Sequence, residues 1–319
     1  MAAALKGDGV DGVAQNDHQE PDALAAARKH FQEEGWAIVP DVLSSEEADT
    51  VVDRLWMAKE AGEKRGDDTF MPTLDPNASN VRVFYLLELD KIFRDLINHP
   101  TTVPMVTAVL GDDYLISNFT ANIARPGSQS MALHSDQSIV VPEPWHHTWA
   151  LNIIWCLSDV YRENGATLFI PGSNKWTSRS QIPVNAPSML RPFEAKKVSK
   201  APAESKAIQT AFFMAESSLI TAADIASVSI QGSIIAMDAR IWHTSGANTT
   251  LDVDRPLLFG YYSAPFLRQQ VNWTAKLPPE IQSELSEELQ QRLGLGATAN
   301  TGRTGDLRYM SVQYPEAKA

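Results

Sequence analysis

The sequence predicts one α+β domain with a β-sandwich or β-barrel at its centre. Helical patterns gather towards the two ends of the chain and strand patterns fill the middle, without the alternation that surrounds a parallel sheet. A length of 319 residues suffices for one large β-rich domain with a full hydrophobic core. We expect residues 1–20 to be a disordered lead-in and residues 21–319 to form that single domain.

The N-terminal part is predicted to be mostly helical. Apolar residues recur at helical spacing over residues 21–34, and Gly35 predicts the end of that helix. Residues 36–40 are typical of a short strand. Ser44, followed by acidic residues, predicts the N-cap of a second helix that runs to about residue 64.

Strands dominate the middle of the chain. They follow a loop-like stretch at residues 66–80 and a mostly helical stretch at residues 91–110, which we expect to be interrupted near Pro100 and Pro104. The predicted strands cover residues 82–89, 115–120, 122–124, 149–157, 165–173, 228–237 and 255–263.

A long insertion and a terminal helix complete the chain. Residues 180–225 are rich in Ala, Ser and Lys and contain several prolines, so they could form a lid, an interface arm or a spacer. Residues 278–293 predict a helix that stops at Gly294. The insertion and this helix lead us to expect a homodimer.

Composition excludes several classes of function. The formal net charge of −12 argues against a nucleic-acid-binding surface, although a local basic patch could still accept an anionic substrate. The single cysteine, Cys156, provides neither a disulfide framework nor a thiolate zinc site. No apolar run long enough for a membrane-spanning helix and no secretory signal are seen, so we expect an intracellular, cytoplasmic protein.

Three side chains could form a metal site. His134 and Asp136 lie two positions apart, and in an extended strand both would point to the same side. An imidazole and a carboxylate are two of the three ligands of the 2-His-1-carboxylate triad of non-haem Fe(II) oxygenases. His243, which follows an apolar strand, is the natural third ligand. The alternative is a chance match among scattered surface or structural side chains.

Arg255 could anchor the co-substrate of such a site. It opens a strand pattern twelve positions after His243, and its permanently charged fork binds carboxylates in a bidentate manner. A 2-oxoglutarate oxygenase needs such an anchor for the distal carboxylate, and the Thr167 hydroxyl could share it. The alternatives are a strand-edge salt bridge of Arg255 with Asp252 or Asp254, and a plain strand role for Thr167.

The motifs together resemble the phytanoyl-CoA dioxygenase family. The resemblance rests on His134-Ser135-Asp136-Gln137, on residues 164–174 (Asn-Gly-Ala-Thr-Leu-Phe-Ile-Pro-Gly-Ser-Asn), on residues 242–248 (Trp-His-Thr-Ser-Gly-Ala-Asn), and on the opening at residues 31–43. It spans roughly residues 22 to 265. The chain is most similar in character to the fungal natural-product branch, which oxidises meroterpenoids and alkaloids.

This resemblance implies a double-stranded β-helix (jelly-roll, cupin-like) core flanked by N- and C-terminal helices. It implies Fe(II) held by His134, Asp136 and His243, with O2 as oxidant. It also implies 2-oxoglutarate held by Arg255, Thr167 and Ser245. One position departs from the pattern: the fungal branch commonly has a glutamine three residues before the first histidine, where this chain has Met131. Either Gln129 substitutes for that glutamine or the contact is missing.

The same resemblance suggests which side chains face the substrate. We expect Phe119, Asn122, Met131 and Asn152 to line the barrel, and Trp145 to contact substrate at its mouth. The neighbouring pair His146 and His147 does not indicate a second metal, since adjacent side chains of an extended chain point to opposite faces.

The sequence thus predicts a dioxygenase that acts on a mostly apolar, terpenoid-like small molecule in secondary-metabolite biosynthesis. Hydroxylation, desaturation, rearrangement and endoperoxide formation all remain open as outcomes. One alternative is an acyl-CoA hydroxylase of the phytanoyl-CoA type. Another is a jelly-roll subunit that binds a partner without catalysis. The carboxylate of Asp136 argues against a halogenase, in which a small residue leaves room for chloride on the iron.

Overall fold

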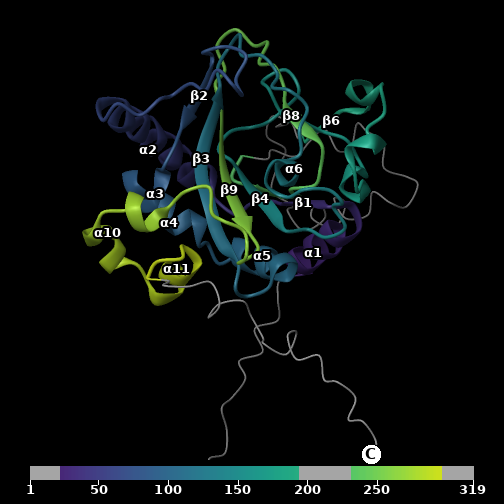
Figure 1. Cartoon of the computed structure of the whole chain (residues 1–319). Coiled ribbons are helices and arrows are strands. Elements are labelled where there is room, and N and C mark those ends of the chain that lie inside the picture. The colour runs from purple at the N-terminus through teal and green to yellow at the C-terminus, as the bar shows by residue number, and fades with distance from the viewer. Residues whose placement is uncertain (1–21, 194–230, 297–319) are drawn as a thin grey trace, which may run out of the picture.

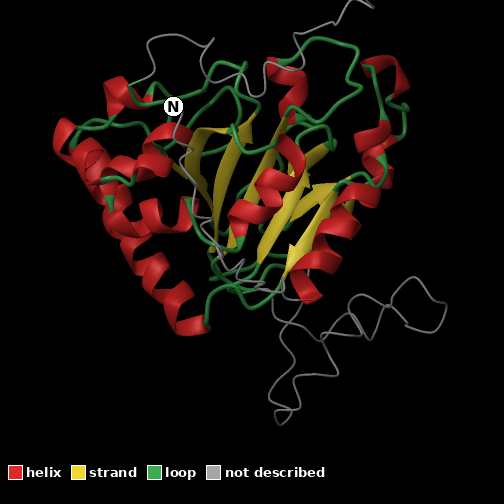
Figure 2. Cartoon of the chain, turned by 90° about the horizontal axis from the view of Figure 1, so that it is seen from below, coloured by secondary structure: helices red, strands yellow, loops and turns green. Residues whose placement is uncertain are grey.

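The fold is mixed, with antiparallel β-sheets at the centre and helices around them. The computed structural model describes residues 22–193 and 231–296 (Figure 1). The predicted lead-in at residues 1–20 lies outside the described residues, as does the insertion from residue 194 onward. Figure 2 shows the strands in the middle of the molecule with helices on either side.

Helices gather towards the two ends of the described chain and most strands lie in its middle, much as the sequence pattern predicts. The described residues form helices α1 (Asp22–Glu34), α2 (Ser45–Lys64), α3 (Leu86–Leu89), α4 (Lys91–Ile97), α5 (Thr102–Leu110), α6 (Asp136–Val140), α9 (Trp273–Lys276), α10 (Pro279–Glu284) and α11 (Glu287–Arg292). They form strands β1 (Trp36–Val39), β2 (Asn80–Val83), β3 (Leu115–Ala124), β4 (Ala150–Cys156), β5 (Thr167–Phe169), β6 (Arg191–Pro192), β7 (Ile234–Asp238), β8 (His243–Ser245) and β9 (Arg255–Ser263).

Two sheets organise these strands. The larger has six strands in the order β1-β7-β4-β9-β3-β2, and the smaller has three in the order β6-β5-β8. The pairings between these strands are antiparallel. Side chains alternate between the faces of a strand, so β9 directs Leu258 towards the helices and Leu257 towards the small sheet. The apolar residues between the sheets include Phe169 of the small sheet and Ile154 of the large one.

Local sequence explains the element boundaries that matter most. Ser44 caps α2 in a reciprocal capping box with Glu47, as the acidic first turn predicts. Gly35 ends α1 with a φ of +81°, and a Cβ there would lie 2.5 Å from Asn174 Nδ2. This glycine therefore allows the chain to turn directly from α1 into β1. Strand β4 is buried at all seven positions, as its apolar sequence predicts.

Three expectations about elements are wrong in detail. The strand predicted over residues 82–89 ends at Val83, because Tyr85 takes a left-handed conformation (φ 58°) and α3 follows. The single helix predicted over residues 278–293 is two helices, because Ser286 caps a new one. Pro104 does not interrupt α5, since it lies in the first turn, where a missing N–H is tolerated.

The first residues of the predicted insertion form regular structure. Residues 180–193 form short 3-10 turns and then β6, which pairs with β5 at the edge of the small sheet. Among the described residues, no helix is both long and apolar enough to cross a membrane.

Candidate metal centre

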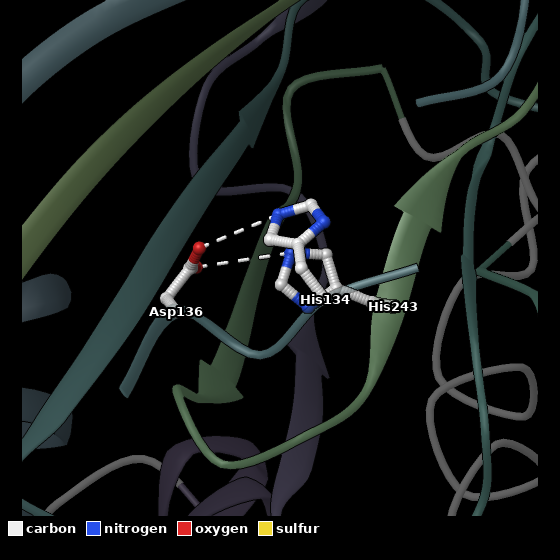
Figure 3. A group of neighbouring side chains, drawn as sticks. All are labelled: His134, Asp136 and His243. Carbon is white, nitrogen blue, oxygen red and sulfur yellow. Dashed lines mark ion pairs between the residues drawn. The ribbon is translucent and has the colours of Figure 1, made fainter. Parts of the chain in front are cut away.

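Three side chains converge where the two sheets meet. Figure 3 shows the Asp136 carboxylate facing the imidazoles of His134 and His243. The Nε2 atom of His134 lies 3.5 Å from one carboxylate oxygen, and that of His243 lies 3.7 Å from the other. Two ligands each about 2.1 Å from one ion lie at most about 4.2 Å apart, so both distances admit a shared metal ion. Candidate ligand atoms of all three residues lie within 4.8 Å of one another.

Backbone pairing brings these residues together. His134 and His243 exchange two backbone hydrogen bonds of 3.0 and 2.8 Å, which form an isolated β-bridge. Ser135 is extended and turns its hydroxyl away from the site, towards the carbonyl of Ala239. The expectation that Asp136 lies in a strand is wrong, because it is the first residue of α6. It still shares a side with His134, because the intervening residue is extended.

The two imidazoles are oriented for metal binding. Nδ1 of His134 lies 2.8 Å from the carbonyl of Ala132, and Nδ1 of His243 lies 2.9 Å from the carbonyl of Ile241. A carbonyl accepts only, so both Nδ1 atoms carry the proton and both Nε2 atoms are left with a lone pair. Such a hydrogen bond fixes the tautomer and the ring orientation of a metal-binding histidine.

Electrostatics favour the protonation states that a metal needs at Asp136 and His243. Burial acts to raise the pKa of Asp136, but His243, His134 and a hydrogen bond from Asn152 outweigh it and lower that pKa to about 2. Burial and the neighbouring His134 lower the pKa of His243 to about 4. Burial alone would lower the pKa of His134, yet the hydrogen bond and charge of Asp136 raise it. The carboxylate is therefore ionised and His243 neutral at neutral pH, as ligands must be.

Asn152, expected to face the substrate, holds the carboxylate of Asp136 in position. Its side-chain amide donates a hydrogen bond of 2.5 Å to Asp136 Oδ2 from the inner face of β4. Asn152 is 4% exposed, so water does not compete for this contact. This contact fixes one oxygen of Asp136 and directs the carboxylate towards the histidines.

Arg255 lies in the same interior with its charge uncompensated. It is 1% exposed, and among the described residues its Nε has no hydrogen-bond partner. A single bond of 3.4 Å runs from its Nη1 to the carbonyl of Asn122. Burial lowers the pKa of Arg255 to about 10, so it stays charged at neutral pH. The alternative role of Arg255, a salt bridge to Asp252 or Asp254, is not seen; Arg125 pairs with Asp254 instead.

A second arginine, which the sequence pattern did not reveal, lies near both His134 and Arg255. Arg82 on β2 makes a two-pronged ion pair with buried Asp75, with both distances 2.7 Å. Its positive charge acts on the pKa values of both His134 and Arg255, which places it near each. An arginine inside the short apolar pattern Asn-Val-Arg-Val was the available signal, because charged residues are seldom buried unless paired.

Comparison with known proteins agrees with this arrangement. Residues 31–256 match the phytanoyl-CoA dioxygenase (PhyH) family, which is most of the chain. The chain belongs to the phytanoyl-CoA dioxygenase family. The matched region contains the three candidate ligands and ends just after Arg255.

Curated relatives and a solved structure add detail to this membership. The chain is 49% identical to "Dioxygenase af480" of Aspergillus fumigatus over 292 residues, which cover 92% of this chain and 83% of that protein. It is 29% identical to "Dioxygenase trt7" of Aspergillus terreus over 122 residues, which cover 34% of this chain and 42% of that protein. The epimerase SnoN, solved with Fe3+, alpha-ketoglutarate and nogalamycin RO, superposes with a TM-score of 0.52 at 16% identity, covering 84% of this chain and 92% of that chain. At that identity the likeness to SnoN shows the fold alone.

The small sheet carries the remaining expected co-substrate residues of this family member. Thr167 of β5 lies directly opposite Ser245 of β8, two residues after His243 on the same face. The Ser245 hydroxyl also accepts a hydrogen bond of 3.1 Å from the backbone N–H of Met131. The Met131 sulfur lies 3.2 Å from Arg82 Nη2, so Met131 borders the site.

Three expected site residues lie elsewhere. Phe119 is wrong as a substrate contact, because it is fully buried on the helix side of β3 against Phe93. Trp145 is wrong as well, since it packs in a buried cluster with Trp242 and its indole donates to the carbonyl of Val141. Gln129 is exposed, which does not fit the buried co-substrate role expected for it. Phe119 differs from Asn122 by an odd number of positions along β3, which places their side chains on opposite faces.

Proposed function

We propose that this chain is an Fe(II)- and 2-oxoglutarate-dependent dioxygenase that oxidises a mostly apolar small molecule. The observation that carries the proposal is the placement of a buried, unpaired arginine in the same interior as a 2-His-1-carboxylate triad. Triads of this kind with open positions are typical of non-haem Fe(II) oxygenases. Membership of the dioxygenase family supports the same reaction class.

Each residue has a defined role in this proposal. His134, Asp136 and His243 would hold iron through their Nε2 and carboxylate atoms, and Asn152 would keep Asp136 in position. Arg255 would bind the distal carboxylate of 2-oxoglutarate, because a buried guanidinium without a partner requires an anion. When bound, iron, 2-oxoglutarate and O2 would supply the oxidation. One oxygen atom of O2 would end in succinate, and carbon dioxide would be released as the second co-product.

Further residues support the co-substrate site. Thr167 and Ser245 present hydroxyls on the face that carries His243, and both would assist Arg255. The side chain of Asn122 has neither its oxygen nor its nitrogen paired among the described residues, so it offers one donor and one acceptor to a bound molecule. Arg82 contributes a second positive charge, held in place by Asp75.

The finer fold follows the same proposal. We infer that the two sheets are the two halves of a double-stranded β-helix (jelly-roll) core. Three features support this: antiparallel pairing in both sheets, an apolar layer between them, and metal ligands at the point where they meet. The similarity in fold to SnoN is consistent with it.

The substrate class is inferred from relatives and from the site. We propose a terpenoid-like natural product of secondary metabolism. A named fungal dioxygenase is 49% identical to this chain, and SnoN belongs to nogalamycin biosynthesis. The carboxylate of Asp136 favours hydroxylation, desaturation, rearrangement or endoperoxide formation over halogenation. The net charge of −12 disfavours the polyphosphate of an acyl-CoA, and a partner subunit without catalysis would not need an intact triad.

An anaerobic titration tests the proposal. Metal-free protein receives Fe(II) and then 2-oxoglutarate, and we expect a weak visible charge-transfer band only when both are present. His134→Ala should lose the band while its circular dichroism stays that of the folded protein. A folded wild-type protein that gives no band, or a His134→Ala variant that keeps it, would contradict the proposal.

A further inference from the structure

A pocket of about 210 Å³ shares structural elements with the candidate metal centre, although none of the three candidate ligands lines it. Val140, one of its lining residues, ends α6, the short helix that Asp136 begins. Tyr261, another lining residue, lies directly opposite Asn152 in the β4–β9 pairing, and Asn152 bonds to Asp136. Directly opposed residues share one face of the sheet, so Tyr261 lies on the face from which Asn152 reaches the carboxylate of the triad. Its lining residues are Ser117, Val140, Tyr261, Ser263, Leu267 and Arg268.

Two buried hydroxyls in this pocket lack partners. Tyr261 is 6% exposed and Ser263 is 1% exposed, and neither hydroxyl has a hydrogen-bond partner among the described residues. They lie two positions apart on β9, so both point to the same face. A buried hydroxyl without a partner is unfavourable. A ligand oxygen in the pocket would give both groups the partner that they lack.

A positive charge completes the polar side of the pocket. Arg268 lines it together with these hydroxyls, and within residues 22–193 and 231–296 no acidic side chain forms an ion pair with it. Arg268 is exposed, so its guanidinium is solvated until a ligand displaces water from it. The guanidinium donates only, and its planar fork matches the two oxygens of a carboxylate.

The pocket has an exposed apolar border, since its lining residue Val140 is itself 37% exposed. Ile139 and Phe266 are 66% and 52% exposed, although large apolar side chains are usually buried. Each directly precedes a pocket residue, Val140 and Leu267 respectively. Exposed apolar residues grouped at a pocket are typical of a binding surface. The site therefore offers an apolar rim with hydrogen-bond donors at its polar side.

We propose that this pocket is the substrate-recognition site, and that it selects an apolar molecule carrying a carboxylate. The carboxylate binds Arg268 and the hydroxyls of Tyr261 and Ser263. The apolar body lies over the rim formed by Ile139 and Phe266, because drug-sized ligands need pockets of about 300 Å³ or more. The inference rests on the proposed function, since the pocket matters for catalysis only beside the metal centre.

Three matched probes test this inference by binding alone. Farnesoic acid, methyl farnesoate and farnesol share one apolar skeleton and differ in the terminal group. Each is titrated into the metal-free full-length protein, and the dissociation constant is measured by calorimetry at neutral pH. We expect the acid to bind about tenfold more tightly than the ester or the alcohol, because only the acid offers a charged partner to the guanidinium.

Variants decide whether the pocket is responsible. Arg268→Gln should abolish the preference for the acid, and Tyr261→Phe should weaken binding of the acid by about three- to tenfold. Arg191→Gln is the matched control: this exposed arginine lies on β6, outside the pocket, and its loss should change nothing. Equal binding of the three probes, tighter binding of the alcohol, no binding of any probe, or a preference that survives Arg268→Gln would each overturn the inference.

The outcome is separable from the test of the proposed function. Probe binding needs neither iron nor 2-oxoglutarate, whereas the charge-transfer band needs both and no substrate. A band without selective binding of the acid overturns only the carboxylate pocket. Selective binding without a band supports the pocket as a ligand site and contradicts the dioxygenase proposal.

Discussion

Arg255→Met should separate stability from co-substrate binding. The substitution removes a guanidinium that is 1% exposed and has one long hydrogen bond, while it keeps a side chain of similar length. A buried charge without a partner is unfavourable, and apolar replacements of buried charges are often neutral or stabilising. We therefore expect the variant without co-substrate to be at least as stable to heat as the wild type.

Co-substrate should reverse that order. At a 2-oxoglutarate concentration of 100 times Kd, the wild type should gain about 2.7 kcal/mol, which raises Tm by about 4 °C in a chain of 319 residues. Truncating one member of a buried charge pair costs about 2–5 kcal/mol, and this weakens binding at least about 30-fold. The variant should therefore show at most about a third of that rise in Tm at the same concentration.

Differential scanning calorimetry with Mn(II) in place of iron measures both effects without turnover. Arg191→Met serves as the control, because that arginine is exposed on β6 and should leave the rise in Tm unchanged. If Arg255→Met keeps the full 2-oxoglutarate-dependent rise, Arg255 does not bind the co-substrate. If the variant unfolds well below the wild type before any ligand is added, the guanidinium has a structural role.

Four further predictions follow from the structure. Asn152→Ala should weaken metal binding about 10- to 100-fold, because Asp136 loses its hydrogen bond, and a Co(II) titration would show no change if Asn152 only faced substrate. Phe119→Ala should lower the free energy of unfolding, measured by urea denaturation, by about 3–5 kcal/mol, and the affinity for 2-oxoglutarate should not change. A loss of affinity without a loss of stability would show that Phe119 belongs to the site. Burial lowers the pKa of His99 below its ordinary value of 6.5, so the unfolded chain binds more protons than the folded one. Stability should therefore fall as pH drops below 6.5. His99→Asn should flatten that fall, and an unchanged dependence of stability on pH would contradict the prediction. Size-exclusion chromatography with light scattering should show a homodimer at micromolar concentration, and a clean monomer would refute that expectation.

The fold was predictable where local signals were strong. The capping box at Ser44, the stop at Gly35 and the apolar run of β4 each specify their element through interactions within a few residues. Residues 84–89 misled the analysis because their apolar character suits a strand or a buried helix equally well. Burial of α3 under other helices decided between the two, and that contact is not local.

The site was predictable in its chemistry but not in all its members. His134, Asp136 and His243 stand out because few other residue types bind iron, and their spacing carried the resemblance to the family. Arg82 was missed because a single arginine in a short strand does not reveal its partner. Phe119 was misplaced because the bulge in β3 between Ile116 and Asn118 and the choice of inner face follow from sheet packing.

The backbone bridge between His134 and His243 has a consequence for how iron would enter and leave. The two histidines lie roughly a hundred residues apart, a long loop to close by metal binding alone. Here two backbone hydrogen bonds close it, so the ordering entropy is lost when the sheets form and not when the ion arrives. Iron would then bind to a preformed site. Removal of iron by a chelator should leave a folded protein that can bind iron again.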